Sequence, residues 1–113
     1  MNEPRVFVPQ VVERYNNDKG RFEPVFDLST ATVFGTLTPI LNPTDNPIYL
    51  ARLTSRIRDG LKDFDADRDC FLAIGDPSLI AVCSGLILRR QKQFKMLKWD
   101  KKMTRYIVMD INP

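Results

Sequence analysis

Histidine is absent from this chain of 113 residues, and cysteine occurs only twice. The missing histidine removes the commonest general base and the commonest metal ligand of proteins. The sequence also has no Gly-x-Ser-x-Gly nucleophile elbow and no cysteine pair at metal-binding spacing. We therefore expect a protein that is not an enzyme, with no catalytic residue, no metal and no cofactor.

Long apolar runs are missing as well. No stretch approaches the roughly 20 apolar residues that are needed to cross a bilayer. The segment 1–5 lacks the basic start and the apolar run of a signal peptide. Cys70 and Cys83 each lie in a short apolar segment, which fits free, packed thiols in a reducing compartment better than a disulfide. We expect a cytoplasmic protein with no membrane partner.

The composition is that of one ordinary globular domain, with 43% hydrophobic and 27% charged residues. The formal net charge is only +3, but the charges are unevenly distributed. Basic and acidic side chains balance over residues 1–64, residues 65–76 are acidic, and residues 77–113 are basic. The basic segment is therefore the first place to look for an anionic partner.

The first part of the chain, residues 1–41, is predicted to be rich in β-structure. Extended runs at 6–12 and 21–28 flank a turn that contains asparagine, aspartate and glycine. The runs contain Pro9 and Pro24, which predicts strands at the rim of a sheet rather than in its middle.

A third strand is predicted at 33–41, and the proline-containing linker 42–47 then leads into residues 48–113. Apolar residues recur at intervals of three and four after the linker, which predicts an amphipathic helix. Asn46 is its expected N-cap, because a proline follows at the first helical position.

The remaining residues alternate between strand and helix signals. The continuous apolar run 70–74 predicts a strand that is buried on both faces. Asp76, followed by proline, predicts the start of a helix over 77–91, and segments 94–99 and 104–111 predict a hairpin. We expect one compact α/β (α+β) domain: a mixed sheet of five to six strands with two helices, an N-terminal β-rich portion and a C-terminal β-hairpin. The 70–74 strand should be central, packed under the second helix and flanked by the hairpin.

Two segments resemble ligand sites, but each has a simpler explanation. The strand-to-helix step at Gly75 and Asp76 could bind a phosphate, but phosphate-binding loops need several glycines and this step has one. A role as helix N-cap explains Asp76. The aspartates of 65–69 are spaced as in a calcium loop, but Cys70 stands where such a loop needs glycine. We expect a solvated loop there.

The most informative feature is a basic segment with interleaved aromatic residues. Its candidate binding residues are Arg89, Arg90, Lys92, Lys95, Lys98, Trp99, Lys101, Lys102, Arg105 and Tyr106. Cationic hairpins with aromatic side chains bind phosphates and stack on bases, so one hypothesis is nucleic-acid binding. The alternative is a solvated sheet edge, where lysines prevent aggregation.

Several short segments resemble a known group of proteins. They are 6–10 (VFVPQ), 26–29 (FDLS) with Phe34-Gly35, Gly75-Asp76-Pro77, 97–101 (LKWDK) and 105–108 (RYIV). Together they are similar to short uncharacterised proteins of tailed bacteriophages, cyanophages among them, over nearly the whole chain. This resemblance implies a phage gene product made in the cytoplasm of a bacterial host. It implies no activity, ligand or functional residue.

Three functional hypotheses follow. The first is a small non-enzymatic binding protein that acts on nucleic acid, or on a host or phage protein that handles nucleic acid. The second is a protein-interaction or virion component that forms homo-oligomers through the proline-bearing N-terminal edge strands. The third is an enzyme of an unrecognised type.

Overall fold

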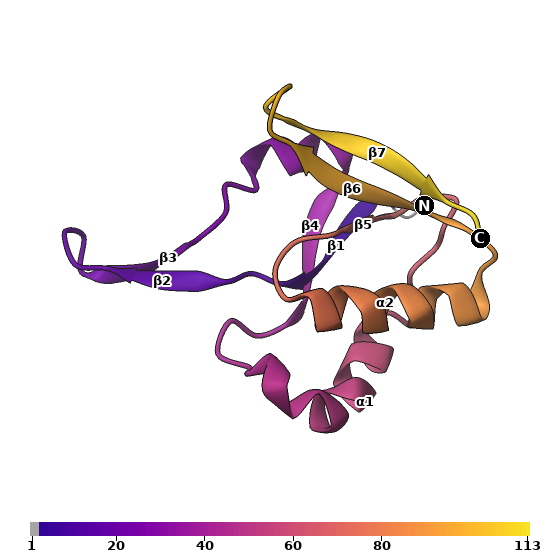
Figure 1. The fold of residues 1–113 in the computed structure, drawn as a ribbon, viewed down its shortest axis with the longest axis horizontal. Helices are drawn as coiled ribbons and strands as arrows, with labels where there is room; N and C mark the ends of the chain where they lie inside the picture. Colours follow the sequence, from indigo (N-terminus) through magenta and orange to yellow (C-terminus); the bar gives the residue numbers. More distant parts are fainter. Residues whose placement is uncertain (1–2) are drawn as a thin grey trace.

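The computed structural model describes residues 3–113, which form a five-stranded sheet with helices on it and a separate two-stranded hairpin (Figure 1). The strands are β1 (Arg5–Gln10), β2 (Glu13–Asn16), β3 (Arg21–Pro24), β4 (Thr36–Leu41), β5 (Cys70–Leu72), β6 (Phe94–Asp100) and β7 (Arg105–Ile111). The helices are η1 (Ser29–Phe34) and η2 (Pro47–Tyr49), both of the 3-10 type, and the α-helices α1 (Leu50–Gly60) and α2 (Pro77–Arg90).

The main sheet has the strand order β4-β1-β5-β6-β7. Strands β4, β1, β5 and β6 are mutually parallel, and β7 returns antiparallel to β6. The predicted mixed sheet and the C-terminal hairpin are therefore confirmed, and β5 lies at the centre as expected. The chain leaves β1 toward β4 and then crosses to the other side of β1, so the strand order reverses between β1 and β5.

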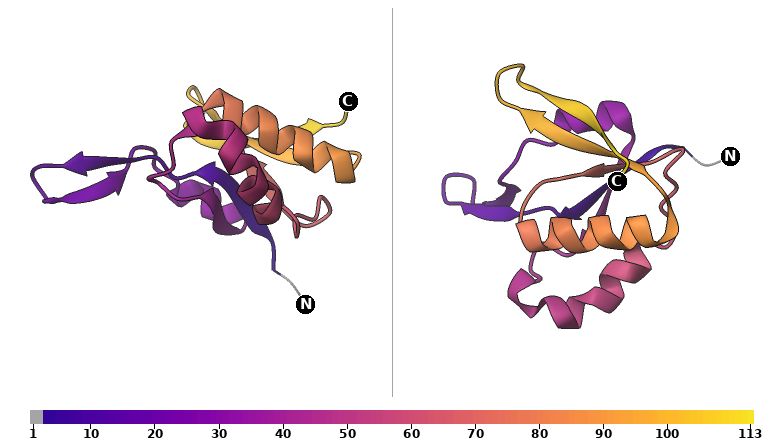
Figure 2. Two further views of the ribbon diagram at one scale, coloured as in Figure 1. Left: turned by 90° about the horizontal axis from the view of Figure 1, so that it is seen from below. Right: turned by 45° about the vertical axis from the view of Figure 1, so that its right-hand side comes forward.

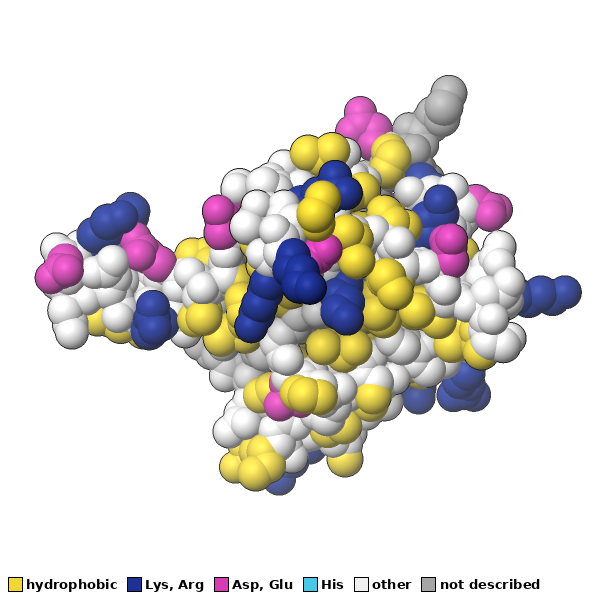
Figure 3. Space-filling view, turned by 45° about the horizontal axis from the view of Figure 1, so that its top comes forward, with side chains coloured by type: hydrophobic (Ala, Val, Ile, Leu, Met, Phe, Trp, Pro, Cys, Tyr) yellow, Lys and Arg dark blue, Asp and Glu magenta, His cyan; other side chains and the backbone are white. Residues whose placement is uncertain are grey.

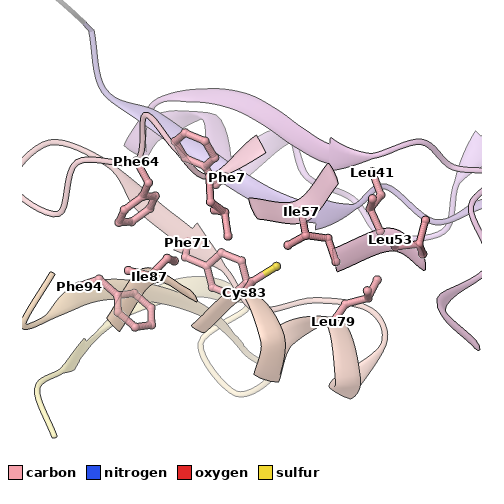
Figure 4. Close-up of a cluster of buried hydrophobic side chains, with 11 residues drawn as sticks. Phe7, Leu41, Leu53, Ile57, Phe64, Phe71, Leu79, Cys83, Ile87 and Phe94 are labelled. Carbon is pink, nitrogen blue, oxygen red and sulfur yellow. The ribbon is translucent and has the colours of Figure 1, made fainter. Parts of the chain in front are cut away.

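The two faces of the sheet are covered by different elements. Helices α1 and α2 pack on one face, while the segment that contains η1 covers the other (Figures 1 and 2). Figure 4 shows side chains from β1, β5, α1 and α2 pointing into a common interior. The larger cluster contains Phe7, Leu41, Leu53, Ile57, Leu61, Phe64, Phe71, Leu79, Cys83, Ile87 and Phe94.

Both predicted N-caps are confirmed, but Asn46 caps the 3-10 helix η2, and the amphipathic helix α1 begins only at Leu50. The Asn46 side-chain oxygen accepts a hydrogen bond from the backbone N–H of Ile48 at 3.1 Å, at the start of η2. The Asp76 carboxylate accepts one from the backbone N–H of Ser78 at 2.8 Å, at the start of α2. Such caps satisfy amide donors that the first turn of a helix leaves unpaired.

The prediction that the Pro9 strand lies at the rim of the sheet is wrong. Strand β1 lies between β4 and β5. Its pairing with β5 involves only Val6 and Phe7, so Pro9 follows the paired part and removes no ladder hydrogen bond on that side. The outer strand beyond β1 is β4, which carries Pro39.

The two-stranded hairpin β2–β3 forms an arm that projects from the body of the protein (Figures 1 and 2). The rings of Tyr15 and Phe22 pair across it edge to face, with centroids 5.2 Å apart, and both are largely exposed. The arm includes the predicted turn, but the predicted strand 21–28 ends at Pro24.

The acidic loop 65–69 is only partly solvated, which corrects the expectation for Asp69. Its side chain is buried and accepts hydrogen bonds from the backbone N–H groups of Arg5 and Asp65, each at 3.0 Å. The Arg68 guanidinium donates two more, at 2.9 and 3.0 Å. The carboxylate thus ties the loop to the start of β1. Among residues 3–113, no cluster of three potential metal ligands occurs.

Candidate functional site

The ten basic and aromatic residues singled out in the sequence do not form one patch. Arg89, Arg90 and Lys92 lie where α2 ends and β6 is about to begin. A second group lies at the opposite end of β6, in or beside its turn with β7: Lys98, Trp99, Lys101, Lys102, Arg105 and Tyr106. Seven residues of strand separate the two ends by about 20 Å. Lys95 lies between the two groups, on β6.

The interpretation of these lysines as protection of a sheet edge is wrong for Lys95. This residue belongs to the part of β6 that is paired on both sides, by β5 and by β7. Lys98 follows the part of β6 that pairs with β5, so the alternative stays open for Lys98. The edge strand of the hairpin is β7, whose only charged residues are Arg105 and Asp110.

The turn-proximal group borders a groove of about 510 Å³ at the carboxyl end of β5 and β6. Open α/β sheets bind their ligands at this end of the parallel strands, at the point where the strand order reverses. That point lies between β1 and β5, one strand away from this groove. The lining residues are Val25, Phe26, Asp27, Ala73, Ile74, Gly75, Lys98, Trp99, Lys101 and Tyr106. Four of the predicted residues are therefore brought together by the fold.

The segment after the arm supplies the other wall of this groove, which the sequence analysis missed. Val25 and Phe26 are each about two-fifths exposed and follow β3 directly. Two adjacent apolar residues depart from the alternation of a half-buried strand. Two consecutive apolar residues after Pro24 are therefore the sequence signal that could have identified this wall.

Two aromatic rings form the apolar side of the groove on the hairpin. Trp99 and Tyr106 face each other across β6 and β7, with ring centroids 5.0 Å apart and an interplanar angle of 69°. Tyr106 is buried, and its hydroxyl donates a hydrogen bond to the backbone oxygen of Asp27 at 3.2 Å. This bond joins the hairpin to the opposite wall, whereas Trp99 remains 39% exposed and available to a ligand.

The charges at the groove are mainly positive. Lys98 and Lys101 are exposed, and neither forms an ion pair with any residue in the described range 3–113. Asp27 is the acidic residue of the lining, and hydrogen bonds from Ser29 hold the pKa of its carboxyl below the usual range. Burial, together with the charge of Asp27, raises the pKa of Tyr106, so this phenol stays neutral.

The groove combines an exposed indole ring with an apolar floor, and two lysines without an ion pair among residues 3–113 line it. Alternation along β6 directs the Lys98 side chain to the opposite face of the strand from Trp99, so Lys98 borders the groove. Figure 3, in which the hairpin side of the protein comes forward, shows Lys and Arg side chains lying among hydrophobic ones. Such a site is suited to a flat, anionic ligand, because the ring offers a stacking face and the lysines offer opposite charge.

A comparison with protein-family models matches residues 4–113 to the family described as phage Pam3 gp32-like protein. The chain belongs to this family. The resemblance to short phage proteins is thereby confirmed, and the family description states no activity. No curated protein and no solved structure matches the chain. None of the helices in residues 3–113 is long and apolar enough to span a membrane.

Proposed function

We propose that this phage protein is a non-enzymatic binding protein that acts on nucleic acid in the host cytoplasm, with the groove beside the β6–β7 hairpin as its binding site. A single-stranded segment would stack one base on Trp99, while Lys98 and Lys101 pair with adjacent phosphates. The observation that carries the proposal is that Lys98, Trp99, Lys101 and Tyr106 all line one largely apolar groove. Stacking is tolerant of base identity, so we expect little sequence preference.

The test is the anisotropy of a fluorescein-labelled thymidine oligonucleotide, titrated with protein at low and at moderate salt. Affinity should fall with salt, with a logarithmic slope of about −1.4 if two phosphates are neutralised on a single strand. Trp99→Ala should weaken binding at least fivefold, because stacking on one base contributes about 1–3 kcal/mol. Lys98→Glu and Lys101→Glu should weaken it and flatten the salt dependence.

Lys92→Glu provides the matched control, since Lys92 is an exposed lysine near the opposite end of the same strand. It should weaken binding less than Lys98→Glu does. Absence of binding at low salt would end the nucleic-acid proposal, because contacts with phosphates must strengthen as salt falls. If Lys92→Glu and Lys98→Glu weaken binding equally, the groove is not the binding site.

A second candidate function, self-assembly, is favoured by the open edge of β7. Val108 and Met109 on this strand are each about two-fifths exposed, and the strand contains no proline. Such an edge pairs readily with another chain. We propose the contact at β7, because β1, one of the two proline-bearing N-terminal strands, is internal.

Light-scattering mass at high micromolar concentration tests the second candidate. A mass above that of one chain, lowered by Val108→Lys, would support assembly through β7. A strictly monomeric mass would rule it out.

A further inference from the structure

A second hollow, of about 240 Å³, lies between the carboxyl-terminal ends of α1 and α2. Its apolar lining consists of Leu61, Phe64, Leu86 and Ile87. Because α2 runs from the carboxyl end of β5 to the amino end of β6, this hollow and the groove lie toward opposite ends of the sheet. The amide of Gln91 at its border is already engaged, since it donates to the backbone oxygen of Phe64 at 2.6 Å.

Three arginines border the hollow without a carboxylate partner. Arg58, Arg89 and Arg90 line it and are exposed, and none forms an ion pair within the part of the chain that the structure describes. Arg90 donates to the backbone oxygen of Lys62 at 2.8 Å, which fixes its position but leaves its charge unanswered. Basic residues are favoured at helix C-termini, yet that preference does not account for an apolar hollow among them.

The size and the lining of the hollow favour one kind of occupant. Its volume lies below the usual 300–1,000 Å³ of a small-molecule cavity and is suited to one large side chain. Phe64, the aromatic residue of the lining, is only 5% exposed and offers no open face on which a base could stack. Arginines around an apolar centre are typical of protein interfaces, where a buried anchor is surrounded by charged pairs.

We propose that this hollow binds an acidic segment of a partner protein. One large apolar side chain of that segment enters between α1 and α2, and its carboxylates pair with Arg58, Arg89 and Arg90. The arginines steer the acidic segment and fix its orientation, while the apolar anchor supplies most of the affinity. This site is independent of the nucleic-acid groove, so either proposal can fail without the other.

The probe is a fluorescein-labelled, aspartate-rich octapeptide that ends in phenylalanine, measured by anisotropy at low salt. Arg58→Gln and Arg89→Gln should each weaken binding about threefold, as expected for one charge pair at a rim. Replacing the peptide's phenylalanine by serine should weaken it more than tenfold. The matched control is Arg52→Gln, because Arg52 is exposed on α1, lies over the Tyr49 ring and does not line the hollow.

Several results would overturn the proposal. One is absence of peptide binding at low salt, and another is an equal effect of Arg52→Gln and Arg89→Gln. A serine peptide that binds as tightly as the phenylalanine peptide would indicate charge attraction alone. Phenylacetate binding that depends on Arg58 and Arg89, without peptide binding, would make the hollow a small-anion site. Thymidine oligonucleotide binding that depends on the same two arginines would make it a nucleic-acid surface.

Leu86→Trp adds an independent measurement, because the larger side chain should fill the hollow and abolish peptide binding. Its circular dichroism and melting temperature show whether it folds. If Leu86→Trp does not fold, Arg58→Gln and Arg89→Gln still test the proposal, because they change exposed residues.

Discussion

Replacing Asp69 with alanine should destabilise the protein by about 3 kcal/mol, because its carboxylate is the buried centre of the loop before β5. The change leaves two backbone N–H groups, those of Arg5 and Asp65, and the Arg68 guanidinium without their acceptor. Breaking a buried ion pair typically costs about 3–5 kcal/mol. The lower end applies here, since the Arg68 side chain is 18% exposed and water can reach it.

Thermal and urea unfolding followed by circular dichroism measure this effect. About 4 °C of melting temperature for each kcal/mol gives a decrease of about 12 °C for a domain of this size. Asp67→Ala is the matched control, because Asp67 is an exposed aspartate in the same loop. It should change the free energy of unfolding by less than about 0.5 kcal/mol. An Asp69→Ala protein that melts within about 2 °C of Asp67→Ala would refute the reasoning.

The stabilisation that Asp69 provides should depend on pH in a defined direction. Burial by itself raises the pKa of Asp69, but hydrogen bonds from Arg68, Asp65 and Arg5 outweigh it and leave the pKa below the usual range. The unfolded chain has the ordinary aspartate pKa of about 3.9. The stabilisation is therefore complete above that value and is lost as the pH falls through the lower pKa of the folded state. The difference between wild type and Asp69→Ala should stay constant from about pH 7 to about pH 5 and shrink below about pH 4. A difference that grows on acidification would contradict this assignment.

Three further predictions concern two glycines and the cysteine thiols. Gly85→Ala should raise the free energy of unfolding by about 0.5–1 kcal/mol, since Gly85 is exposed within α2 and an added Cβ meets nothing within 4 Å. Gly35→Ala should lower the free energy of unfolding by more than about 1 kcal/mol, because φ is +150° and the added Cβ would lie 2.6 Å from the Pro4 oxygen. Thermal melts compare the two glycine variants, and similar melting temperatures would contradict this reasoning. Burial raises the pKa of Cys83 to about 12 and also raises that of Cys70, so at pH 8 a thiol reagent should label neither cysteine until urea is added. Rapid labelling of the folded protein would contradict their burial.

Much of the fold could be predicted because its signals lie within a few residues of one another. The N-caps Asn46 and Asp76 act on amides two residues away, so their sequence neighbours suffice to locate the helix starts. The apolar run that became β5 predicts a central strand, because only a strand covered on both faces has no polar side.

The candidate site could be predicted only in part. The sequence singled out Lys98, Trp99, Lys101 and Tyr106, since basic and aromatic residues alternate along one hairpin. It also grouped Arg89 with them because they are close in sequence, although the predicted strand 94–99 already separates Arg89 from Trp99 by the length of β6. The opposite wall, from the segment after the arm, comes from far away in the sequence.

What the sequence by itself determined is the set of local elements: the caps, the amphipathic stripe, the buried run, the hairpin and the absence of histidine. The tertiary structure alone decided that β1 is internal despite Pro9, that β4 and β7 are the edge strands of the main sheet and that Asp69 is buried. The physical reason is that caps and periodicity act within one or two turns of chain. Strand order and the burial of a charge depend instead on pairings between residues far apart in sequence, such as Arg5 with Asp69, which no local pattern encodes.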